Sequence, residues 1–299
     1  MITFLSGGTG TPKLLQGARR VLKDTDISVI VNTGEDIWYQ GGHISPDVDT
    51  VMYLFSGMLN TTTWWGVNGD TFITHEIIRK VLSDAYMSIG DRDRAVHIIR
   101  AELLESGMTL TQVTKELCCH FGITGTILPM SDSAFTTYVR TEEGEIHFQE
   151  YWVKNRGKTP ILSVIHKPEK QPSATDEVLK AIRNAEAIVI GPSNPVTSIL
   201  PILSCTGVRE ELERKKVIAI SPFIGDSPVS GPAKELMQSI GYQADSGGVR
   251  TLYGELIQIF IQDTRDTVSV PGSIRHDTLM KSPEIAEDLM KMILSLCSG

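Results

Sequence analysis

Residues 2–13 read Ile2-Thr3-Phe4-Leu5-Ser6-Gly7-Gly8-Thr9-Gly10-Thr11-Pro12-Lys13, and they decide the fold. The first four side chains are apolar or β-branched, which predicts a short buried strand. Three glycines follow within four residues, and they let the backbone turn sharply and approach a ligand closely. We expect Thr11 to cap the next helix and Pro12 to take its first position, where the missing N–H is no loss.

The helix predicted after this turn has one apolar face. Its members recur at helical spacing and are Leu14, Leu15, Ala18, Val21 and Leu22. A strand, a glycine turn and a helix start together form an anion site, because backbone N–H groups and the helix dipole point at the ligand. We therefore predict that the turn binds phosphate, with a tight turn that holds no ligand as the alternative. The residues predicted to bind are Gly7, Gly8, Thr9, Gly10, Thr11 and Lys13.

Neither common phosphate-binding motif fits this turn. Lys13 stands where the dinucleotide-binding fingerprint needs its last glycine, and Pro12-Lys13-Leu14 replaces the Gly-Lys-Ser/Thr of a P-loop. The second predicted strand, 27–31, ends at Asn32 instead of the acidic residue that contacts the ribose in NAD-binding proteins. The turn thus predicts a phosphate site that is neither an ordinary NAD site nor an ordinary NTPase site, and we place Asn32 beside it.

Composition excludes several classes of function. The chain has 299 residues, of which 41% are hydrophobic, and this is ample for a large core. Its net charge of −8, from 28 basic and 36 acidic residues, argues against a nucleic-acid-binding surface. No apolar run approaches the roughly 18 residues of a membrane span, and nothing at the start resembles a signal peptide. The four cysteines form no Cys-x-x-Cys pair, so we expect reduced thiols and a cytoplasmic protein.

Two carboxylates lie two residues apart in the stretch Ser45-Pro46-Asp47-Val48-Asp49-Thr50. Pro46 and Asp47 resemble a turn that opens the apolar segment 51–58, so we expect Asp47 to cap a helix. Asp49 is the better functional candidate, because hard divalent cations favour carboxylate oxygens beside phosphates. The sequence therefore predicts a metal-binding role for Asp49.

Two further clusters have more than one interpretation. Trp64 and Trp65 precede a glycine, and they either wall an aromatic ligand or pack in the core. Asp91 and Asp93 open a predicted helix, where they either complement the helix dipole or belong to a phosphate–metal site. Both pairs of alternatives stay open at this point.

Alternating strands and helices predict an α/β fold, with a Rossmann-like, mostly parallel sheet and helices on both faces. The predicted strands of this sheet are 2–5, 27–31, 187–190, 217–220 and 257–261. Strand-like segments between them, at 124–129, 135–140 and 146–148, predict an inserted α+β subdomain. We therefore expect one nucleotide-binding domain over residues 1–299, with an insertion at approximately 60–165.

Glycine–proline loops follow two of the late strands. Gly191-Pro192-Ser193-Asn194-Pro195 follows the first, and Ser221-Pro222-Phe223-Ile224-Gly225 follows the second. Strand ends of a parallel sheet meet at one crevice, so we expect these loops to hold a nucleotide base and ribose. Ser230-Gly231-Pro232-Ala233-Lys234 repeats the residue order of the first turn, and Thr197-Ser198 is expected to cap a helix. The nucleotide-binding residues predicted here are Gly191, Pro192, Ser193, Asn194, Ser221, Ile224 and Gly231.

Together these motifs resemble those of the 2-phospho-L-lactate transferase family, and the resemblance extends over nearly the whole chain. The motifs that carry it lie at 6–14, 32–36, 45–50, 90–93, 191–195, 221–222 and 231–233. The resemblance implies an enzyme that builds the deazaflavin coenzyme F-420 of methanogens and some other microbes. Such an enzyme moves a 2-phospholactyl group, or phosphoenolpyruvyl in some members, from a guanosine diphosphate-linked donor to the deazaflavin Fo, and releases GMP. It also implies Mg²⁺ as a cofactor, a homodimer, and an insertion that binds Fo.

The same resemblance implies roles for individual residues. Lys13 and the glycine turn would hold the diphosphate, and Lys13 counts as one of two catalytic residues. Asp49, the other, would bind magnesium or the ribityl hydroxyl of Fo. The residues implied to contact Fo are Asp49, Thr50, Ser88 and Asp91.

Two other classes of protein stay as alternatives. The same superfamily contains regulators, similar to gluconeogenesis factors, that resemble this chain in the first strand, turn and helix and bind nucleotide sugars without group transfer. An NAD(P) oxidoreductase is disfavoured by Lys13 and Asn32. Bound GDP or Fo would support the transferase, a bound UDP-sugar the regulator, and hydride transfer the oxidoreductase.

Overall fold

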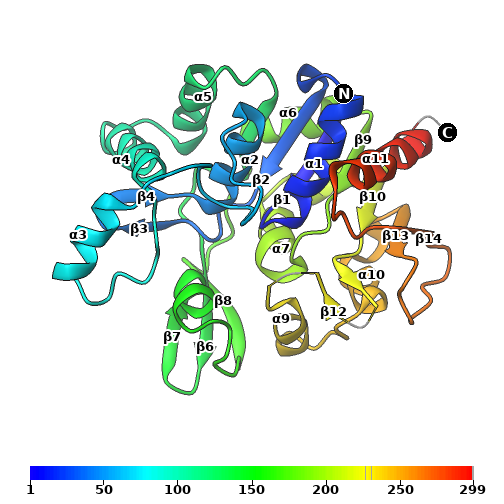
Figure 1. The fold of residues 1–299 in the computed structure, drawn as a ribbon. Coiled ribbons are helices and arrows are strands. Elements are labelled where there is room, and N and C mark those ends of the chain that lie inside the picture. Colours follow the sequence, from blue (N-terminus) through cyan, green and yellow to red (C-terminus); the bar gives the residue numbers. More distant parts are fainter. Residues whose placement is uncertain (226, 230, 298–299) are drawn as a thin grey trace.

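A parallel sheet forms the centre of the computed structural model, which describes residues 1–225, 227–229 and 231–297 (Figure 1). Across these residues the sheet has seven strands in the order β14-β13-β10-β9-β1-β2-β5, and each of its pairings is parallel. The bounds are β1 Ile2–Ser6, β2 Ile27–Val31, β5 Thr126–Pro129, β9 Ala187–Ile190, β10 Val217–Ile220, β13 Ile259–Asp263 and β14 Ile274–His276. The predicted fold class is confirmed.

The central strands are buried on both faces. All five residues of β1 are buried, and Phe4 and Leu5 belong to two different apolar cores. Successive side chains of a strand point to opposite faces, so one continuous apolar run supplies both cores. For this reason the strands occur in the sequence as short continuous apolar runs, without the alternation of apolar and polar residues that a half-buried strand shows.

Helices cover both faces of the sheet (Figure 1). The core that contains Phe4 also holds side chains of α1 Gly10–Val21, α2 Pro46–Ser56, α4 Asp91–Glu105, α5 Leu110–His120 and α11 Pro283–Cys297. The core that contains Leu5 holds side chains of α6 Asp176–Asn184, α7 Leu200–Ser204, α8 Val208–Leu212, α9 Ala233–Ser239 and α10 Ser246–Tyr253. The helix α9 begins inside the predicted motif 230–234, of which Ser230 lies outside the described residues.

Smaller elements extend from the central sheet. An antiparallel sheet in the order β7-β6-β8 projects from the body in Figure 1, and β3 and β4 form a hairpin beside α3 and α4. The bounds are β3 Ile37–Tyr39, β4 Gly42–Ile44, α3 Ile73–Val81, β6 Thr136–Thr141, β7 Gly144–His147, β8 Ser163–Lys167, β11 Phe223–Ile224 and β12 Ser227–Pro228. Single helical turns lie at Asp24–Asp26, Glu150–Lys154, Pro195–Ile199 and Gly254–Leu256. The interval 60–165 also supplies β5 to the central sheet, and the division of the chain into domains stays a prediction.

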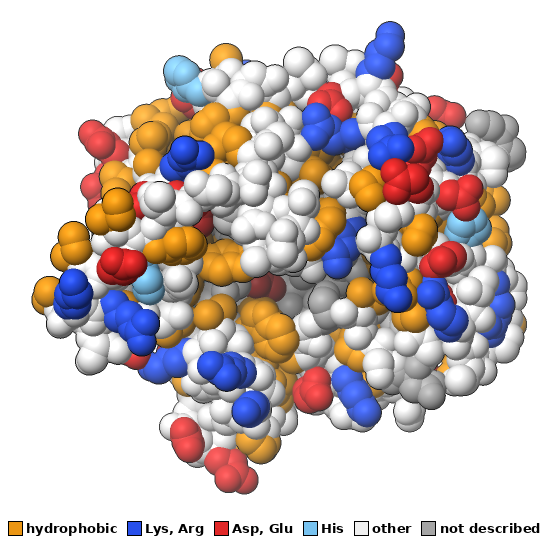
Figure 2. All heavy atoms as spheres, viewed as in Figure 1, with side chains coloured by type: hydrophobic (Ala, Val, Ile, Leu, Met, Phe, Trp, Pro, Cys, Tyr) orange, Lys and Arg blue, Asp and Glu red, His pale blue; other side chains and the backbone are white. Residues whose placement is uncertain are grey.

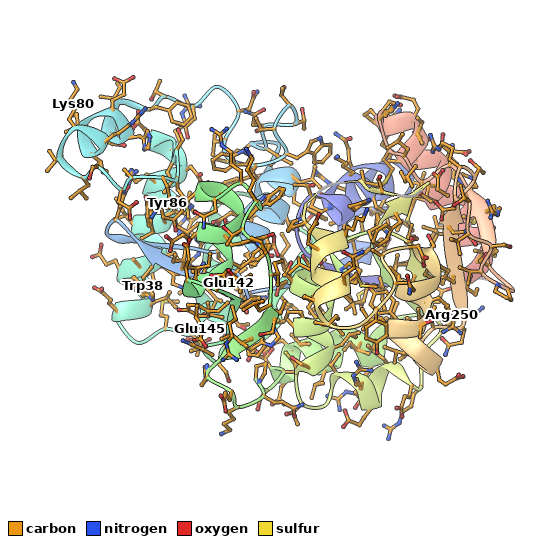
Figure 3. The ribbon with its side chains drawn as sticks, turned by 90° about the horizontal axis from the view of Figure 1, so that it is seen from below. Trp38, Lys80, Tyr86, Glu142, Glu145 and Arg250 are labelled. Carbon is orange, nitrogen blue, oxygen red and sulfur yellow. The ribbon has the colours of Figure 1, made fainter. Side chains whose placement is uncertain are left out.

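Figure 3 gives the view from below, with the labelled Lys80, Tyr86 and Trp38 on the side of α3 and the β3–β4 hairpin, and Arg250 of α10 on the opposite side. Among the described helices, none combines the length and the apolar character that crossing a bilayer requires.

The strand order changes direction at β1. The chain crosses from β1 through α1 to β2 on one side, whereas β9 pairs with β1 on the other side. Ligands of open α/β sheets bind in the crevice outside the carboxyl ends of strands at such a point. The loops after β1 and β9 therefore form the floor of the expected site.

The two terminal helices of the chain, α1 and α11, pack closely because one contact residue is a glycine. A Cβ atom added at Gly17 would lie 2.2 Å from the carbonyl carbon of Ala286. Any side chain at Gly17 would therefore push the backbone of α11 away.

We expect Gly17→Ala to lower the free energy of unfolding by about 1–3 kcal/mol, the usual cost of overpacking a core. Alanine favours a helix over glycine, so a loss would show that the contact with α11 outweighs helix propensity. Urea unfolding measures the change, with Gln16→Ala on the same helix as the control. A gain in stability would contradict the packing argument.

Candidate active site

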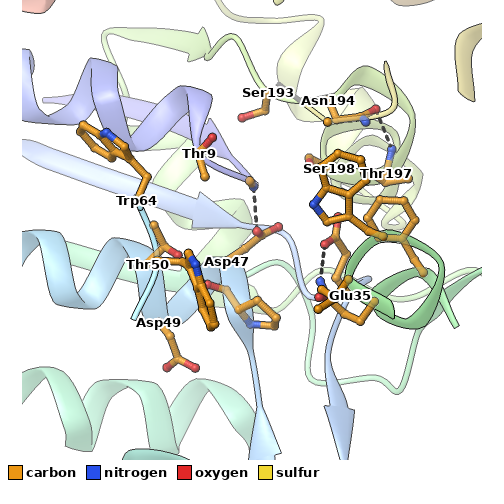
Figure 4. A pocket seen from close by; sticks show the side chains of 18 of the residues that line it. Thr9, Glu35, Asp47, Asp49, Thr50, Trp64, Ser193, Asn194, Thr197 and Ser198 are labelled. Carbon is orange, nitrogen blue, oxygen red and sulfur yellow. Dashed lines mark hydrogen bonds between the residues drawn. The ribbon is translucent and has the colours of Figure 1, made fainter. Parts of the chain in front are cut away.

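A cavity of about 630 Å³ lies at the carboxyl ends of β1 and β9. In Figure 2 the face of the molecule is hollowed between the β6–β8 sheet and the main body, with hydrophobic side chains around the hollow. Figure 4 shows the cavity from close by. Among the residues that line it are Gly8, Thr9, Gly10, Glu35, Asp47, Asp49, Thr50, Tyr53, Trp64, Trp65, Asp93, His97, Phe148, Gln149, Trp152, Pro192, Ser193, Asn194 and Gly231.

The predicted glycine turn lies at the floor of this cavity. Gly8 adopts a φ of +56°, a conformation that glycine tolerates and other residues rarely adopt. The Gly7 N–H donates to Ser193 Oγ at 3.2 Å, which ties the turn to the loop after β9. Helix α1 begins at Gly10 with Thr9 as its N-cap, so the prediction that Thr11 caps the helix is wrong. Thr11 instead hydrogen-bonds Ser193 through its hydroxyl at 2.5 Å.

Gly10 is required by packing as well as by any ligand. A Cβ atom at Gly10 would lie 1.9 Å from the carbonyl oxygen of Pro192, and one at Gly191 would lie 2.0 Å from Thr11 Oγ1. The two loops therefore touch through their main chains, and the cavity floor has a fixed width. A bulky residue at Gly10 would disturb the fold as well as phosphate binding.

Asp47 does not cap helix α2, and the expectation from sequence is wrong on this point. Its carboxylate accepts a hydrogen bond from the Gly8 N–H at 2.7 Å and from Asn32 Nδ2 at 2.8 Å. Figure 4 shows Asp47 directed at the glycine turn. Burial raises the pKa of Asp47 and of its neighbour Glu35, because a charged carboxylate loses hydration there. Asn32, predicted at the nucleotide site, reaches that turn through Asp47.

Asp49 points away from the turn, toward α4, where it forms a buried ion pair with Arg100 (Figure 4). One guanidinium nitrogen of Arg100 lies 3.1 Å from Asp49 Oδ2 and the other contacts Oδ1, while Arg100 also donates to the His43 carbonyl at 2.9 Å. Burial by itself would raise the pKa of Asp49, but Arg100 and then His97 outweigh it and lower this pKa to about 2. Asp49 is therefore a stable anion.

His97 connects Asp49 to a second carboxylate. Its Nε2 atom lies 3.3 Å from Asp49 Oδ2 and 3.1 Å from Asp93 Oδ1, and the Tyr53 hydroxyl donates to Asp93 at 2.8 Å. Burial by itself would lower the pKa of His97, but the two carboxylates raise it to about 9. At neutral pH His97 is therefore a cation between two anions.

Asp49, Asp93 and His97 offer one ligand atom each within 4.8 Å of one another, as a metal site would. This arrangement fits Mg²⁺ poorly. Arg100 contacts both oxygens of Asp49, and Mg²⁺ prefers oxygen ligands to an imidazole nitrogen. The role of Asp49 as a magnesium ligand thus stays a prediction, and the geometry favours its role as a hydrogen-bond acceptor.

Trp64 separates the cavity from a second one of about 440 Å³. Trp64 and Trp65 both line the main cavity, so the structure favours the interpretation that they wall a ligand site. Lys13 lines only the second cavity, where its Nζ lies 5.4 Å from the centre of the Trp64 ring. Burial lowers the pKa of Lys13. Gly10 and Pro192 line both cavities, which meet at the start of α1.

Two residues implied to contact Fo lie outside the cavity lining. Ser88 is exposed, although its neighbours Met87 and Ile89 line the cavity. The Asp91 carboxylate accepts hydrogen bonds from the hydroxyls of Thr71 and Thr74, which lower its pKa most. It also accepts the N–H groups of Ile73 and Thr74 at the start of α3. Asp91 thus acts as a cap for α3, and Thr50 is the member of this set that lines the cavity beside Asp49.

The loops after β9 and β10 each contribute some of their residues to the cavity lining. Pro192, Ser193 and Asn194 line the cavity. Asn194 also caps the following turn through the N–H groups of Val196 and Thr197, so the prediction that Thr197 or Ser198 is the cap is wrong. The second loop contributes Pro222 to the lining.

Two other predicted residues of the second loop, Ser221 and Ile224, lie outside the cavity lining. Ser221 is buried against Ser246 at 2.6 Å, and Ile224 pairs with Ser227 in the short β11–β12 hairpin. Neither lines the cavity, whereas Gly231 does.

Sequence reasoning missed His97 and Arg100 on α4, whereas Asp93 was already a candidate for a phosphate–metal site. Asp93, His97 and Arg100 are spaced four and three residues apart, which places them on one side of a helix. Such polar residues are expected on a solvent face, yet all three are buried. The spacing of these residues on one helix face was the signal that the sequence offered. The partner of Arg100, Asp49, lies 51 residues away in the chain.

The fold and the cavity define the class first: a Rossmann-like α/β protein with an acidic, aromatic-walled site at the point where its strand order changes direction. Residues 2–288 match the family described as 2-phospho-L-lactate transferase CofD, and the chain belongs to this family. It is therefore an enzyme of the transferase class.

Relatives agree with this assignment, and a solved structure shares the fold. The 2-phospho-L-lactate transferase of Methanospirillum hungatei is 72% identical over 99% of both chains. That of Methanocorpusculum labreanum is 49% identical over 99% of this chain and 98% of its own. The crystal structure of a UPF0052 family member from Bacillus halodurans has a TM-score of 0.65 and 17% identity, over 98% of both chains. At that identity the likeness shows the fold alone.

The charge network around His97 predicts a pH-dependent stability. The pKa of His97 is about 9 in the folded protein and 6.5 ordinarily, so its protonated form stabilises the fold fully below pH 6.5. This contribution disappears as the pH rises through 9. We expect the difference in unfolding free energy between wild type and His97→Gln to shrink by about 3 kcal/mol from pH 6 to pH 10.

Urea unfolding at several pH values measures this difference. His120→Gln is the control for the loss of a histidine, and its effect on stability should be small because its ion pair on α5 is exposed. A difference that grows with pH would contradict the assignment of a cation at His97.

Proposed function

We propose that the enzyme transfers a 2-phospho-L-lactyl group, or its phosphoenolpyruvyl analogue, from a guanosine diphosphate-linked donor to the deazaflavin Fo. The products are coenzyme F-420-0 and GMP. The observation that carries the proposal is one cavity whose lining includes a glycine turn and helix start, tryptophans, and a fixed anion, Asp49. Membership of the transferase family supports it.

The donor would bind across the start of α1. A diphosphate interacts well with backbone N–H groups and a helix N-terminus, and Lys13 supplies a positive charge from the adjoining cavity. The nucleoside would then extend along Pro192 to Asn194, toward Gly231. Polar groups of this loop would select the base, because a mismatched base leaves buried groups unpaired.

The acceptor would bind on the opposite side of the main cavity. A flat deazaflavin ring matches the tryptophan wall, which includes Trp64, Trp65 and Trp152. Its ribityl hydroxyl would then reach Asp49, which accepts a hydrogen bond and orients the attacking oxygen. A carboxylate with a pKa of about 2 is a weak base, so orientation rather than proton removal is its role.

The reaction is a displacement at phosphorus. The ribityl oxygen forms a bond to the phosphorus that carries the lactyl group, and the bond from that phosphorus to the bridging oxygen of GMP breaks. GMP leaves with the electron pair, and the hydroxyl proton passes to the surrounding solvent or buffer. Positioning and charge stabilisation provide most of the rate acceleration in such transfers.

The family resemblance adds further expectations to this proposal. They are a requirement for Mg²⁺ and a homodimer, and the cysteine pattern adds a cytoplasmic location. No step above depends on the metal, and loss of turnover after chelation, restored by added Mg²⁺, would test its requirement.

Incubation with Fo, Mg²⁺ and each guanylated donor, followed by mass spectrometry, tests the proposed function. We expect a product of Fo mass plus the phospholactyl or phosphoenolpyruvyl group, together with GMP. Calorimetry should show tighter binding of GDP than of ADP or UDP. No transfer product with a preference for a UDP-sugar would favour a nucleotide-sugar-binding regulator instead.

Asp49→Asn keeps the size of the side chain and removes its charge. We expect turnover to fall by roughly two orders of magnitude, the scale of losing one key electrostatic group. The substitution also leaves Arg100 unpaired in a buried position, so thermal melting must show that the variant is folded.

GDP binding without metal should change little in Asp49→Asn, because Asp49 does not contact the glycine turn. Asp36→Asn is the matched control, since that carboxylate is largely shielded from solvent near the site and both of its oxygens accept from Ser45 Oγ at 2.8 Å. Full activity of Asp49→Asn would contradict its orienting role.

A further inference from the structure

The backbone donor that should bind phosphate is already occupied. The Gly8 N–H at the start of α1 donates to Asp47 Oδ1 at 2.7 Å, and the other oxygen of Asp47 accepts from Asn32 Nδ2 at 2.8 Å. The Asp47 side chain lines the cavity and is buried, with 4% of its surface exposed. The anion site of the turn therefore holds an anion that belongs to the protein.

A carboxylate and a phosphate oxygen cannot share this position. Both are hydrogen-bond acceptors and both carry negative charge, so each competes for the same N–H and repels the other. The repulsion is strong in a buried site, because little water screens it. A diphosphate that binds to the Gly8 N–H thus requires that the Asp47 carboxylate leave it.

We propose that Asp47 occupies the position of a phosphate oxygen in the ligand-free enzyme, and that its departure from Gly8 controls access of the diphosphate to the glycine turn. This inference rests on the proposed nucleotide donor. It assigns to Asp47 a role distinct from that of Asp49, two residues further along the same helix.

The contacts of the two carboxylates explain why Asp47 is the one that can move. Asp49 is held by a cation, Arg100, on both oxygens. Within the described part of the chain, Asp47 accepts hydrogen bonds from neutral donors, a backbone N–H and an amide. Asp47 thus lacks the opposite charge that pairs with Asp49 inside the protein, so an incoming diphosphate, which is also an anion, can take over its hydrogen bonds.

The neighbouring backbone limits where the displaced side chain can go. A Cβ atom at Gly7 would lie 2.9 Å from Asp47 Oδ2, which shows that the carboxylate lies directly against the turn. Toward the cavity the space is open, since Asp47 is one of the residues that line it. Rotation of the side chain into the cavity frees Gly8 without movement of the main chain.

Calorimetric titration with inorganic pyrophosphate, in the presence of a chelator, tests the inference. We expect Asp47→Asn and Asp47→Ala to bind pyrophosphate at least about tenfold more tightly than the wild type, because the competing charge is gone. Asp36→Asn removes another carboxylate that is largely shielded from solvent and does not contact the turn, and its affinity should equal that of the wild type. Melting curves establish that each variant is folded, and a merely structural role for Asp47 predicts weaker binding, not tighter.

Equal or weaker pyrophosphate affinity in both folded Asp47 variants would overturn the inference, and so would an equal gain in Asp36→Asn. A parallel titration with GDP separates this result from the proposed function. Wild-type protein that binds GDP no better than pyrophosphate would count against the guanosine-linked donor, while the comparison of Asp47 variants with pyrophosphate would still decide the role of Asp47.

Discussion

The buried ion pair between Asp49 and Arg100 is the interaction on which the site depends. Arg100 is completely buried, so its charge must be matched inside the protein. Removing one member of such a pair typically costs about 3–5 kcal/mol, because the other charge is left without a partner. Since Arg100 also donates to the His43 carbonyl, the pair joins α2, α4 and the β3–β4 hairpin into one wall of the cavity.

Environment gives the carboxylates of one cavity opposite properties. Asp49 is surrounded by Arg100 and His97 and stays ionised, whereas Asp47 and Glu35 face neutral donors and each other, so burial raises their pKa. Sites that hold acids of unlike strength can assign them unlike tasks. In this enzyme one carboxylate is a permanent anion and another is a displaceable one.

Local sequence patterns predicted most elements of the fold correctly but fewer of the contacts in the site. Buried strands, the glycine turn and the long helices follow from patterns within about 15 residues, and these predictions were correct in type. The cap of α1 was misassigned to Thr11 rather than Thr9, because the Thr9 side chain makes no capping hydrogen bond that a hydroxyl pattern could predict. The direction of Asp47 and the partner of Arg100 depend on contacts 39 and 51 residues apart, which no local pattern contains.

The contact between Gly10 and the Pro192 carbonyl has a consequence for how substrate preference can vary. Because the floor of the cavity is main chain against main chain, its dimensions do not respond to the exchange of side chains. Members of such a family can diversify only at the walls, where Trp64, Phe148 and Trp152 present replaceable surfaces. The end of the ligand that contacts the floor is thus expected to stay the same among such proteins, while the end that contacts the walls can vary.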